Sequence, residues 1–279
     1  RGVNRISGMK SADQERPRHT IPAVCKAMEL LGVLAEEQGE TTTKALALRL
    51  RVPRTTCYRL LRSLISRDWV RPLPGGGHAI SIGLLPLLQP LREVEGLAEA
   101  VQPVLDALAL RSSLTAKVSV RQGDYAITVA RCESPQATSI AVRVGASFHL
   151  SLGSSGTVLL SGLSRQEMEE VLRRAPEECW THQARADVHR RLEELQNQGW
   201  CADQGSFRPS CHAVSTPLRD PRGKILAAMT IIGFPQDLSG KKVASSARLL
   251  VEAARQAERR LRQPESQQSV PGKAEAGGR

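Results

Sequence analysis

The 279-residue sequence predicts an α+β protein with a small N-terminal domain and a larger C-terminal one. Apolar residues recur at helical spacing through the first part of the chain, and the connections between the helical runs are short. Beyond residue 110, apolar and polar residues alternate in runs separated by turn residues, and amphipathic helical runs follow.

The basic excess lies mainly at the N-terminus, because residues 1–90 carry 14 Lys and Arg against 7 Asp and Glu, whereas residues 91–279 carry 25 Lys and Arg against 21 Asp and Glu. A polyanionic partner is therefore expected for the N-terminal part.

Composition favours a globular, cytoplasmic protein without membrane association. Hydrophobic residues make up 41% of the chain. The longest apolar stretch, Ile225–Ile232, is far shorter than the roughly 20 residues of a membrane-spanning helix. Six cysteines lie far apart without a Cys-x-x-Cys pair, which favours reduced thiols in a cytosol.

The N-terminal region begins with a polar segment, residues 1–20, that is expected to be a disordered arm. A helix is predicted from Pro22, since proline suits a first helical turn and Gln38-Gly39 would end the helix. Its apolar residues at helical spacing are Val24, Met28, Leu31 and Ala35.

Two further helices follow closely. Thr41–Thr43 offer N-caps for a short helix over Lys44–Leu50, with Leu46 and Leu50 on one side. A tight connection at Arg51-Val52 leads to Pro53, which opens the third helix.

The third helix is predicted to have two unlike faces. One stripe is apolar and is expected to face a core: Cys57, Leu60, Leu61 and Leu64. The opposite stripe, about 200° around the helix, carries Thr55, Tyr58, Arg59 and Arg62, with Arg54 and Thr56 beside them and no acid. Arginine side chains donate hydrogen bonds to guanine edges or to phosphates, and hydroxyl groups form hydrogen bonds to bases or to phosphates. These six residues are therefore predicted to contact DNA. The third helix of the chain would be the second, recognition helix of a helix-turn-helix.

A β-hairpin wing is expected after this helix. Trp69–Arg71 and His78–Ile80 are predicted strands, and Pro74–Gly77 is the turn between them. Arg71 and His78 are the expected wing contacts to DNA. A nucleotide-binding loop is disfavoured because no G-x-x-x-x-G-K-[ST] sequence follows the glycines. The alternative for the whole region is a small helical protein-interaction domain.

The C-terminal region begins with helical residues. Leu84–Leu110 is predicted to be helical with proline interruptions, which fits a linker helix followed by the first helix of a new domain. A hairpin is predicted from Lys117–Arg121 and Asp124–Ala130, and a third strand from Ile140, Val142 and Val144.

Later elements are predicted from capping and turn residues. Ser164-x-x-Glu167 is a capping box before one helix, and Gly199 ends another that contains Val188, Leu192 and Leu195. A turn over Asp220–Gly223 leads into the strand Ile225–Ile232, and Lys241–Arg262 is the last amphipathic helix. The expected organisation is a DNA-binding domain over 21–83, a linker helix over 84–100, a second domain over 101–262 and a disordered tail over 263–279.

Several segments resemble the IclR family of bacterial regulators. In the N-terminal part these are Ala27–Leu31 and Val52–Leu61, the latter close to the family pattern L-P-[KR]-[ST]-T-x-[HY]-R-L-L. In the C-terminal part they are Val144-Gly145, Leu152–Leu160, Ala213–Leu218 and Ala227–Gly233. The chain departs from the family where His78–Ser81 replaces the usual wing sequence, where Thr157 replaces a lysine, and where Gln204–Ser206 replaces acidic residues.

The resemblance implies a winged helix-turn-helix, a linker helix and a GAF-like effector-binding domain with helices on both sides of its sheet. It further implies a non-enzymatic transcription regulator that binds a double-stranded DNA operator as a homodimer or tetramer and responds to a small organic acid, without a cofactor.

The same resemblance implies an effector site around Ser154, Ser155, Asp203 and Thr230. Gly153–Gly156 leads into a predicted helix over Thr157–Leu163, and backbone N–H groups at a helix start suit a carboxylate. Relatives also use the positions of Ala213 and Ile232, where this chain is less polar.

Two alternatives rest on cysteine and histidine. Cys179, His182, Cys211 and His212 could serve a metal site, but only Cys179-x-x-His182 has suitable spacing and no matched second pair follows. A Cys-dependent hydrolase would use Cys211, but the adjacent His212 should point to the other side of a strand. No metal ligand and no catalytic residue is therefore assigned.

Overall fold

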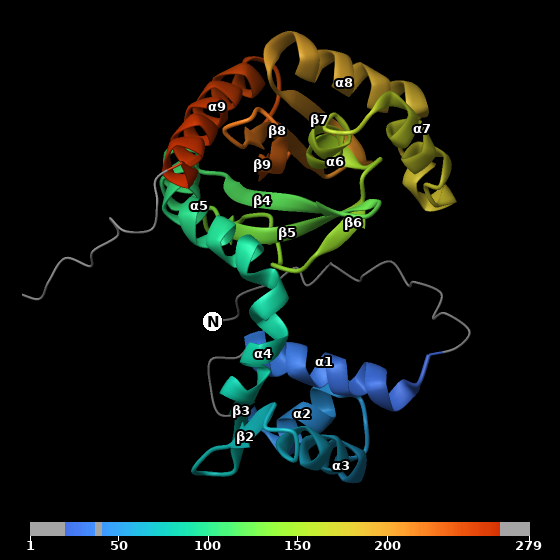
Figure 1. The fold of residues 1–279 in the computed structure, drawn as a ribbon, viewed down its shortest axis with the longest axis vertical. Helices are drawn as coiled ribbons and strands as arrows, with labels where there is room; N and C mark the ends of the chain where they lie inside the picture. The colour runs from blue at the N-terminus through green and yellow to red at the C-terminus, as the bar shows by residue number, and fades with distance from the viewer. Residues whose placement is uncertain (1–19, 37–40, 263–279) are drawn as a thin grey trace, which may run out of the picture. The chain divides into compact units, whose positions relative to one another are not determined.

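The computed structural model describes residues 20–36 and 41–262, and the chain divides into two compact units, residues 1–91 and 92–279 (Figure 1). The expected arm up to residue 19, the helix end at Gln38-Gly39 and the expected tail over 263–279 lie outside the described residues. Among the described helices, none is both long and apolar enough to span a membrane.

The described residues of the first unit up to Ile80 form three helices and a small antiparallel sheet. The helices are α1 (Pro22–Glu36), α2 (Thr43–Leu50) and α3 (Arg54–Ile65). The strands are β1 (Thr41–Thr42), β2 (Val70–Pro72) and β3 (Gly77–Ile80), in the order β1-β3-β2. The three predicted helices and the wing are confirmed, whereas β1 was not predicted, because two threonines carry no strand pattern.

The core of the first unit joins all three helices to β2. Its fully buried members are Leu30, Leu46, Cys57, Leu61 and Val70. The buried face of α1 is formed by Leu30 and Leu34, whereas Val24 and Met28 of the predicted stripe are exposed. Helical spacing thus identified the helix but not the side of it that meets the core.

The segment between the two regions is not one continuous helix. The short α4 (Leu85–Leu88) lies between two 3-10 turns, Ile82–Leu84 and Gln89–Leu91. Pro86 and Pro90 remove backbone donors here, which accounts for the interruptions. The long α5 (Arg92–Ser112) then begins the second unit, so the expected boundary at residue 100 lies inside this helix.

The second unit is built on a six-stranded antiparallel sheet. Its strands are β4 (Thr115–Gln122), β5 (Tyr125–Cys132), β6 (Ser147–His149), β7 (Cys201–Arg208), β8 (Cys211–Arg219) and β9 (Ile225–Gly233). Their order is β6-β5-β4-β9-β8-β7. The β4–β5 hairpin turns at Gly123, as predicted.

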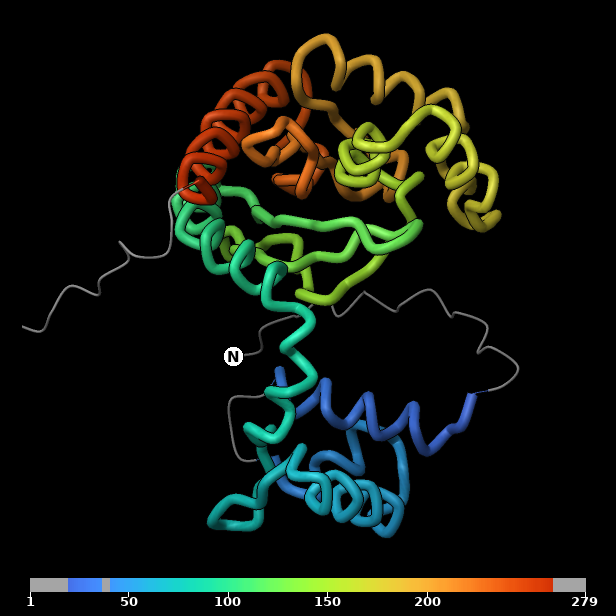
Figure 2. Tube along the Cα trace, in the orientation of Figure 1, coloured from blue at the N-terminus to red at the C-terminus, as the bar shows by residue number. Residues whose placement is uncertain are grey.

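Helices cover both faces of this sheet (Figure 2). On one face α5 and α9 (Lys241–Leu261) pack on β4, β5, β8 and β9 around a large apolar core. On the other are α6 (Gly153–Leu160), α7 (Arg165–Arg173) and α8 (Arg185–Gln198), with a 3-10 turn at Glu177–Trp180. The expected α+β domain with helices on both sides of its sheet is confirmed.

Two predicted elements lie elsewhere. Ile140–Val144 is not a strand, and the third strand of this region is β6, which pairs with β5 from Ser147. The chain turns at Gly145, whose φ is 81°, before it can pair, and Val144 is exposed. The helix expected over Thr157–Leu163 begins at Gly153 and ends at Leu160. Ser154 and Ser155, which were expected to precede the helix, therefore lie in its first turn.

Local capping signals were reliable. Ser164 and Glu167 form the predicted reciprocal capping box at the start of α7. Gly199 ends α8 in the left-handed conformation, with φ of 79°. Asp220 accepts hydrogen bonds from the backbone N–H groups of Arg222 and Lys224 and so fixes the turn into β9.

Candidate DNA-binding and effector sites

The exposed face of α3 carries the predicted DNA-contacting residues. All six of them are exposed: Arg54, Thr55, Thr56, Tyr58, Arg59 and Arg62. On the opposite side Cys57, Leu61 and Leu64 are buried and Leu60 is half-buried. The two-faced character of the helix is therefore present in the fold.

The cationic groups of α3 are not engaged by the residues that the structure describes. Among the described residues, the guanidinium groups of Arg54, Arg59 and Arg62 form no ion pair. The helix starts after Pro53 without a side-chain cap, so its first N–H groups are also unsatisfied. Free arginines and a positive helix end both favour phosphate oxygens as partners.

The turn before α3 is tight because Arg51 adopts the left-handed conformation, with φ of 52°. Its N–H and that of Val52 bond back to the carbonyl oxygen of Ala47 in α2. This closure sets α3 directly after α2, as a helix-turn-helix requires.

The two predicted wing residues differ in accessibility. Arg71 is exposed on β2, at the edge of the small sheet. His78 is half-buried on the middle strand β3, paired in register with Thr41 and Pro72. Its Nδ1 is buried and has no hydrogen-bond partner among the described residues.

Three of the four predicted effector residues belong to one chain of buried hydroxyl groups. Ser154 Oγ lies 2.8 Å from Ser215 Oγ, which lies 2.8 Å from Thr230 Oγ1, which lies 3.0 Å from Ser155 Oγ. All four side chains are buried between α6 and the sheet. Each hydroxyl both donates and accepts readily, so the chain can exchange internal bonds for bonds to a polar ligand.

Asp203, the fourth predicted residue, lies beside the start of α6. Its carboxylate accepts hydrogen bonds from the N–H groups of Ser206 and Phe207, at 2.9 and 3.1 Å. A Cβ atom built on Gly153 would lie 3.6 Å from Asp203 Oδ2, so the carboxylate closely approaches the first turn of the helix. The fold thus brings all four predicted residues to one end of α6.

Sequence reasoning missed Arg191, which is fully buried on α8. Its Nε donates to Thr157 Oγ1 at 3.0 Å and its Nη2 to Gln183 Oε1 at 2.8 Å, while Nη1 lies 3.9 Å from Asp203 Oδ1. Burial lowers the pKa of Arg191, but an arginine stays charged at neutral pH. A buried cation from α8 therefore reaches Thr157 of α6.

Lys117 was also missed. Its side chain is 6% exposed, and its Nζ lies 4.4 Å from the centre of the Phe148 ring. Burial lowers the pKa of Lys117 to about 8. The sequence held a signal for it, since strand alternation places Lys117 on the same face of β4 as Thr115 and Ser119, which are both buried.

The metal and hydrolase alternatives find no matching geometry in the described part of the chain. No three His, Cys, Asp or Glu side chains of those residues are grouped as metal ligands would be. His182 is exposed whereas Cys179 is buried, and His212 Nδ1 lies 2.6 Å from the carbonyl oxygen of Leu238. Burial raises the pKa of the Cys211 thiol to about 11, which keeps it protonated and a weak nucleophile.

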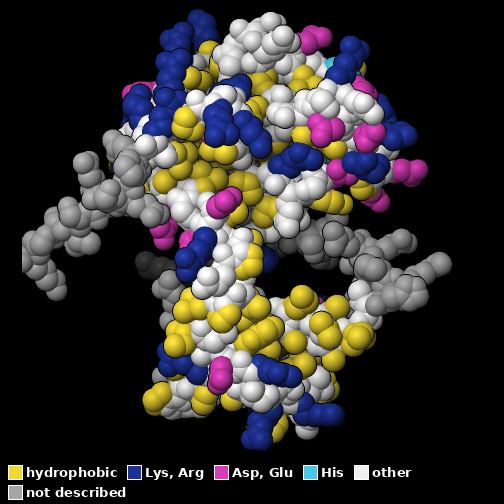
Figure 3. Space-filling view, viewed as in Figure 1, with side chains coloured by type: hydrophobic (Ala, Val, Ile, Leu, Met, Phe, Trp, Pro, Cys, Tyr) yellow, Lys and Arg dark blue, Asp and Glu magenta, His cyan; other side chains and the backbone are white. Residues whose placement is uncertain are grey.

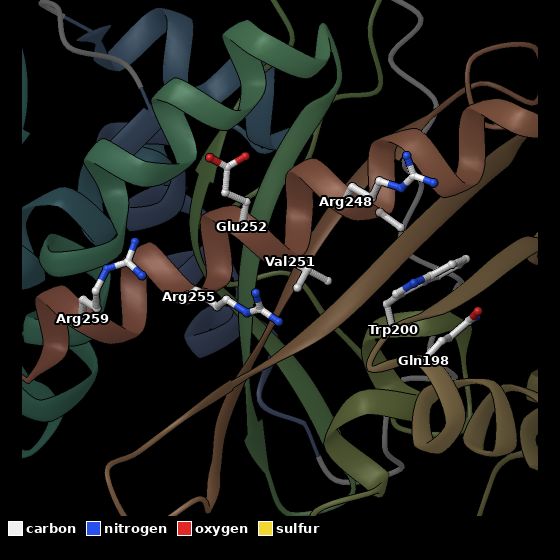
Figure 4. Close-up of a pocket in the computed structure, with 8 residues that line it drawn as sticks. Gln198, Trp200, Arg248, Val251, Glu252, Arg255 and Arg259 are labelled. Atoms are coloured by element: carbon white, nitrogen blue, oxygen red, sulfur yellow. The ribbon is translucent and has the colours of Figure 1, made fainter.

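A separate open hollow of about 490 Å³ is lined by residues of α9 and by Gln198 and Trp200. Figure 4 shows Trp200 and Gln198 near the α9 side chains Arg248 and Val251, with Arg255 and Arg259 further along the helix. None of the predicted effector residues lines it. Its arginine-rich, open character is unlike the enclosed hydroxyl cluster beneath α6.

Comparisons with known proteins agree with this architecture. The model of the IclR helix-turn-helix domain matches residues 23–74, and that of the bacterial transcriptional regulator IclR C-terminal domain matches residues 92–259. The HTH-type transcriptional repressor AllR of Klebsiella pneumoniae is 23% identical over 237 residues, covering 84% of this chain and 87% of that protein. The AllR repressor of Escherichia coli K12 is 22% identical over the same length, covering 84% and 88%.

Solved structures show the same fold. The IclR protein of Thermotoga maritima superimposes with a TM-score of 0.65 at 20% identity, covering 85% of this chain and 98% of that one. An IclR homologue from Microbacterium hydrocarbonoxydans, solved in complex with 4-hydroxybenzoate, has a TM-score of 0.65 at 19% identity, covering 86% and 99%. With family models matching both regions, this chain belongs to the IclR family of bacterial transcriptional regulators, and it is not an enzyme.

Proposed function

We propose that this protein is a sequence-specific DNA-binding regulator controlled by a small organic acid. The observation that carries the proposal is α3, whose apolar side is buried while its other side presents unpaired arginines and hydroxyl groups. Recognition helices of helix-turn-helix proteins have this division, because they must pack on their own domain and bond base edges and phosphates at once. With DNA as its partner, the protein is expected to act in the cytoplasm.

The proposed DNA contacts differ in what they supply. Arg59 lies in the middle of α3 and Arg62 in its last turn, where both suit base edges, while Arg54, Thr55 and Thr56 in its first turn suit phosphates. Tyr58 is 55% exposed and adds a hydroxyl. Arg71 is the better-placed wing residue, since His78 is half-buried.

The proposed effector site is the buried polar cluster at the start of α6. Ser154, Ser155 and Thr230 supply hydroxyl groups, and Asp203 approaches from β7. The 4-hydroxybenzoate bound to the Microbacterium hydrocarbonoxydans homologue supports an organic acid as the ligand class. Ligand binding and DNA binding would influence each other by the same factor, as linkage requires.

A homodimer completes the proposal. The first unit exposes several large apolar side chains, which are costly to leave in water. They gather over α1 and the segment around α4 (Figure 3): Ile21, Val24, Met28, Ile82, Leu85, Leu87, Leu88 and Leu91. A second copy covering this surface would present two α3 helices to neighbouring half-sites of an operator.

Substitution of Arg59 tests the recognition helix. Arg59→Ala should weaken binding to duplex DNA selected by the wild-type protein, by about tenfold or more if it bonds a base edge. Arg59→Glu should weaken it further because a carboxylate repels phosphates. Fluorescence anisotropy measures the affinities, and Arg222→Ala, an exposed arginine in a turn of the other unit, is the matched control. Unchanged affinity for both Arg59 variants, with circular dichroism confirming folding, would remove the recognition-helix assignment.

A further inference from the structure

Lys117 is a buried cation for which the described residues supply no anion. It projects from β4, where its register partners are Arg131 on β5 and Thr230 on β9. Its ammonium group has no hydrogen bond and no ion pair with any described residue, and its close contact is the face of Phe148. The Nζ atom is not among the fully buried polar atoms that lack a hydrogen-bond partner, so it stays reachable. A cation at the end of so deeply buried a side chain favours an anionic partner that can reach it.

The nearby acidic groups do not fill that role. Asp203 is already held by the N–H groups of Ser206 and Phe207 and lies 3.9 Å from the guanidinium of Arg191. Cys211, the titratable group that acts on Lys117, is a protonated thiol because burial raises its pKa to about 11. The positive charge of Lys117 is therefore left without a balancing group among the residues that the structure describes.

Aromatic surface lies between Lys117 and the proposed effector cluster. The Phe148 ring contacts the ammonium, and its centre lies 5.6 Å from that of Phe207. Phe207 in turn would lie 3.7 Å from a Cβ atom on Gly153, the first residue of α6. Two of the three phenylalanines in the chain thus line the path from the cation to the hydroxyl cluster. Both rings are only half-buried, which leaves apolar surface available to a ligand.

We propose that Lys117 binds the carboxylate of an aromatic acid, whose ring lies against Phe148 and Phe207 and whose polar substituents reach the hydroxyl groups of Ser154, Ser155 and Thr230. This assignment rests on the proposed effector function and adds the residue that makes the site selective for an acid. Thr230 is the register partner of Lys117, so cation and hydroxyl cluster adjoin on the same face of the sheet.

The test compares acids with their neutral amides on the full-length protein. Isothermal titration calorimetry at pH 7 with benzoate, benzamide, 4-hydroxybenzoate and 4-hydroxybenzamide should give wild-type affinities at least about tenfold higher for the acids. Lys117→Met, which keeps the length of the side chain but not its charge, should abolish that preference. Lys241→Met, at an exposed position at the start of α9, is the matched control and should retain it.

Three results would overturn the assignment. One is a Lys117→Met protein that prefers acids as strongly as the wild type does. Another is a wild-type protein that binds amides as well as acids, or neither of them. The third is a Lys117→Met melting temperature below that of the ligand-free wild type, because that result would make Lys117 part of the folded framework instead of an unpaired cation.

A separate readout distinguishes this assignment from the proposed function. If benzoate binds through Lys117 but leaves the affinity for selected duplex DNA unchanged, the control of DNA binding by an acid is contradicted while the carboxylate site stands. If benzoate changes DNA affinity equally in wild type and Lys117→Met, acid control stands and the role of Lys117 is contradicted.

Discussion

At the scale of single residues, the second unit places charge in its interior in two different ways. Arg191 is surrounded by acceptors, with hydrogen bonds to Thr157 and Gln183 and with Asp203 nearby. Lys117 has an aromatic face and no acceptor among the described residues. Arg191 holds neighbouring segments together through Nε and Nη2, while its Nη1 has no hydrogen-bond partner among the described residues. The two cations therefore differ in how far the described residues hold their charged groups.

The burial of Lys117 predicts a specific pH dependence of stability. Its pKa falls from 10.5 to about 8 on folding, so the native state loses this proton at lower pH than the unfolded chain does. Below pH 8 the destabilisation is fully present and is on the order of 3 kcal/mol. Between pH 8 and 10.5 the wild type should regain stability, because there the unfolded state binds more protons.

Denaturant unfolding of wild type and Lys117→Met from pH 7 to 10 measures this effect. The variant should be the more stable protein at pH 7, and the difference should shrink above pH 8. Cys211, with a pKa of about 11, stays neutral over most of this range and is present in both proteins. A difference that is independent of pH would contradict the burial of a charged Lys117.

At the scale of elements, α6 decides the geometry of the effector cluster. A Cβ atom on Gly156 would lie 2.2 Å from the carbonyl oxygen of Leu150, so the helix packs directly on the backbone that follows β6. Only a glycine permits that approach. The approach in turn sets the hydroxyl groups of Ser154 and Ser155 against Ser215 and Thr230.

Alanine at Gly156 should therefore damage both stability and ligand binding. Gly156→Ala forces α6 away from Leu150 and should lower the free energy of unfolding by about 1–3 kcal/mol, as overpacking does. Gly96→Ala is the matched control, because Gly96 is also helical, in α5, and nothing lies within 4 Å of its added Cβ. That control should gain about 0.5–1 kcal/mol from helix propensity. Thermal and urea unfolding measure both, and equal effects of the two substitutions would contradict the close packing of α6.

At the scale of the whole molecule, the first unit exposes an apolar surface that a second copy of the protein would cover. Met28 on α1 and Leu88 on α4 are 68% and 45% exposed, and they belong to the group gathered there. The hydrophobic effect favours covering such a surface. Two-fold symmetry would let the same surface cover itself in a second copy.

Negative charge introduced on the apolar surface of the first unit should separate the two copies of a dimer. Met28→Glu with Leu88→Glu should shift the protein toward monomer in sedimentation velocity and reduce its affinity for a two-half-site operator. Leu48→Glu, at an apolar position of α2 that is 81% exposed and lies outside the group, should leave the oligomeric state unchanged. The folding of the first unit should survive all three changes, since none of these side chains is in its core. A dimer that persists in the double variant would place the interface elsewhere.

The sequence by itself determined the features that depend on near neighbours in the chain. The two faces of α3, the capping box at Ser164, the stop at Gly199 and the turn at Gly123 follow from residues a few positions apart. Backbone capping and helical periodicity act over one or two turns, so these elements could be read without the fold.

Only the tertiary structure decided what lies together at the effector site and which side of α1 is buried. Ser154 meets Ser215 across 61 residues, and Ser155 meets Thr230 across 75. The resemblance to the IclR family predicted three of these four hydroxyl groups as effector residues. It predicted neither Ser215 nor the cations Lys117 and Arg191. A side chain shows whether it is satisfied only when its distant neighbours are in place, because burial and hydrogen bonding are properties of the packed chain and not of the local sequence.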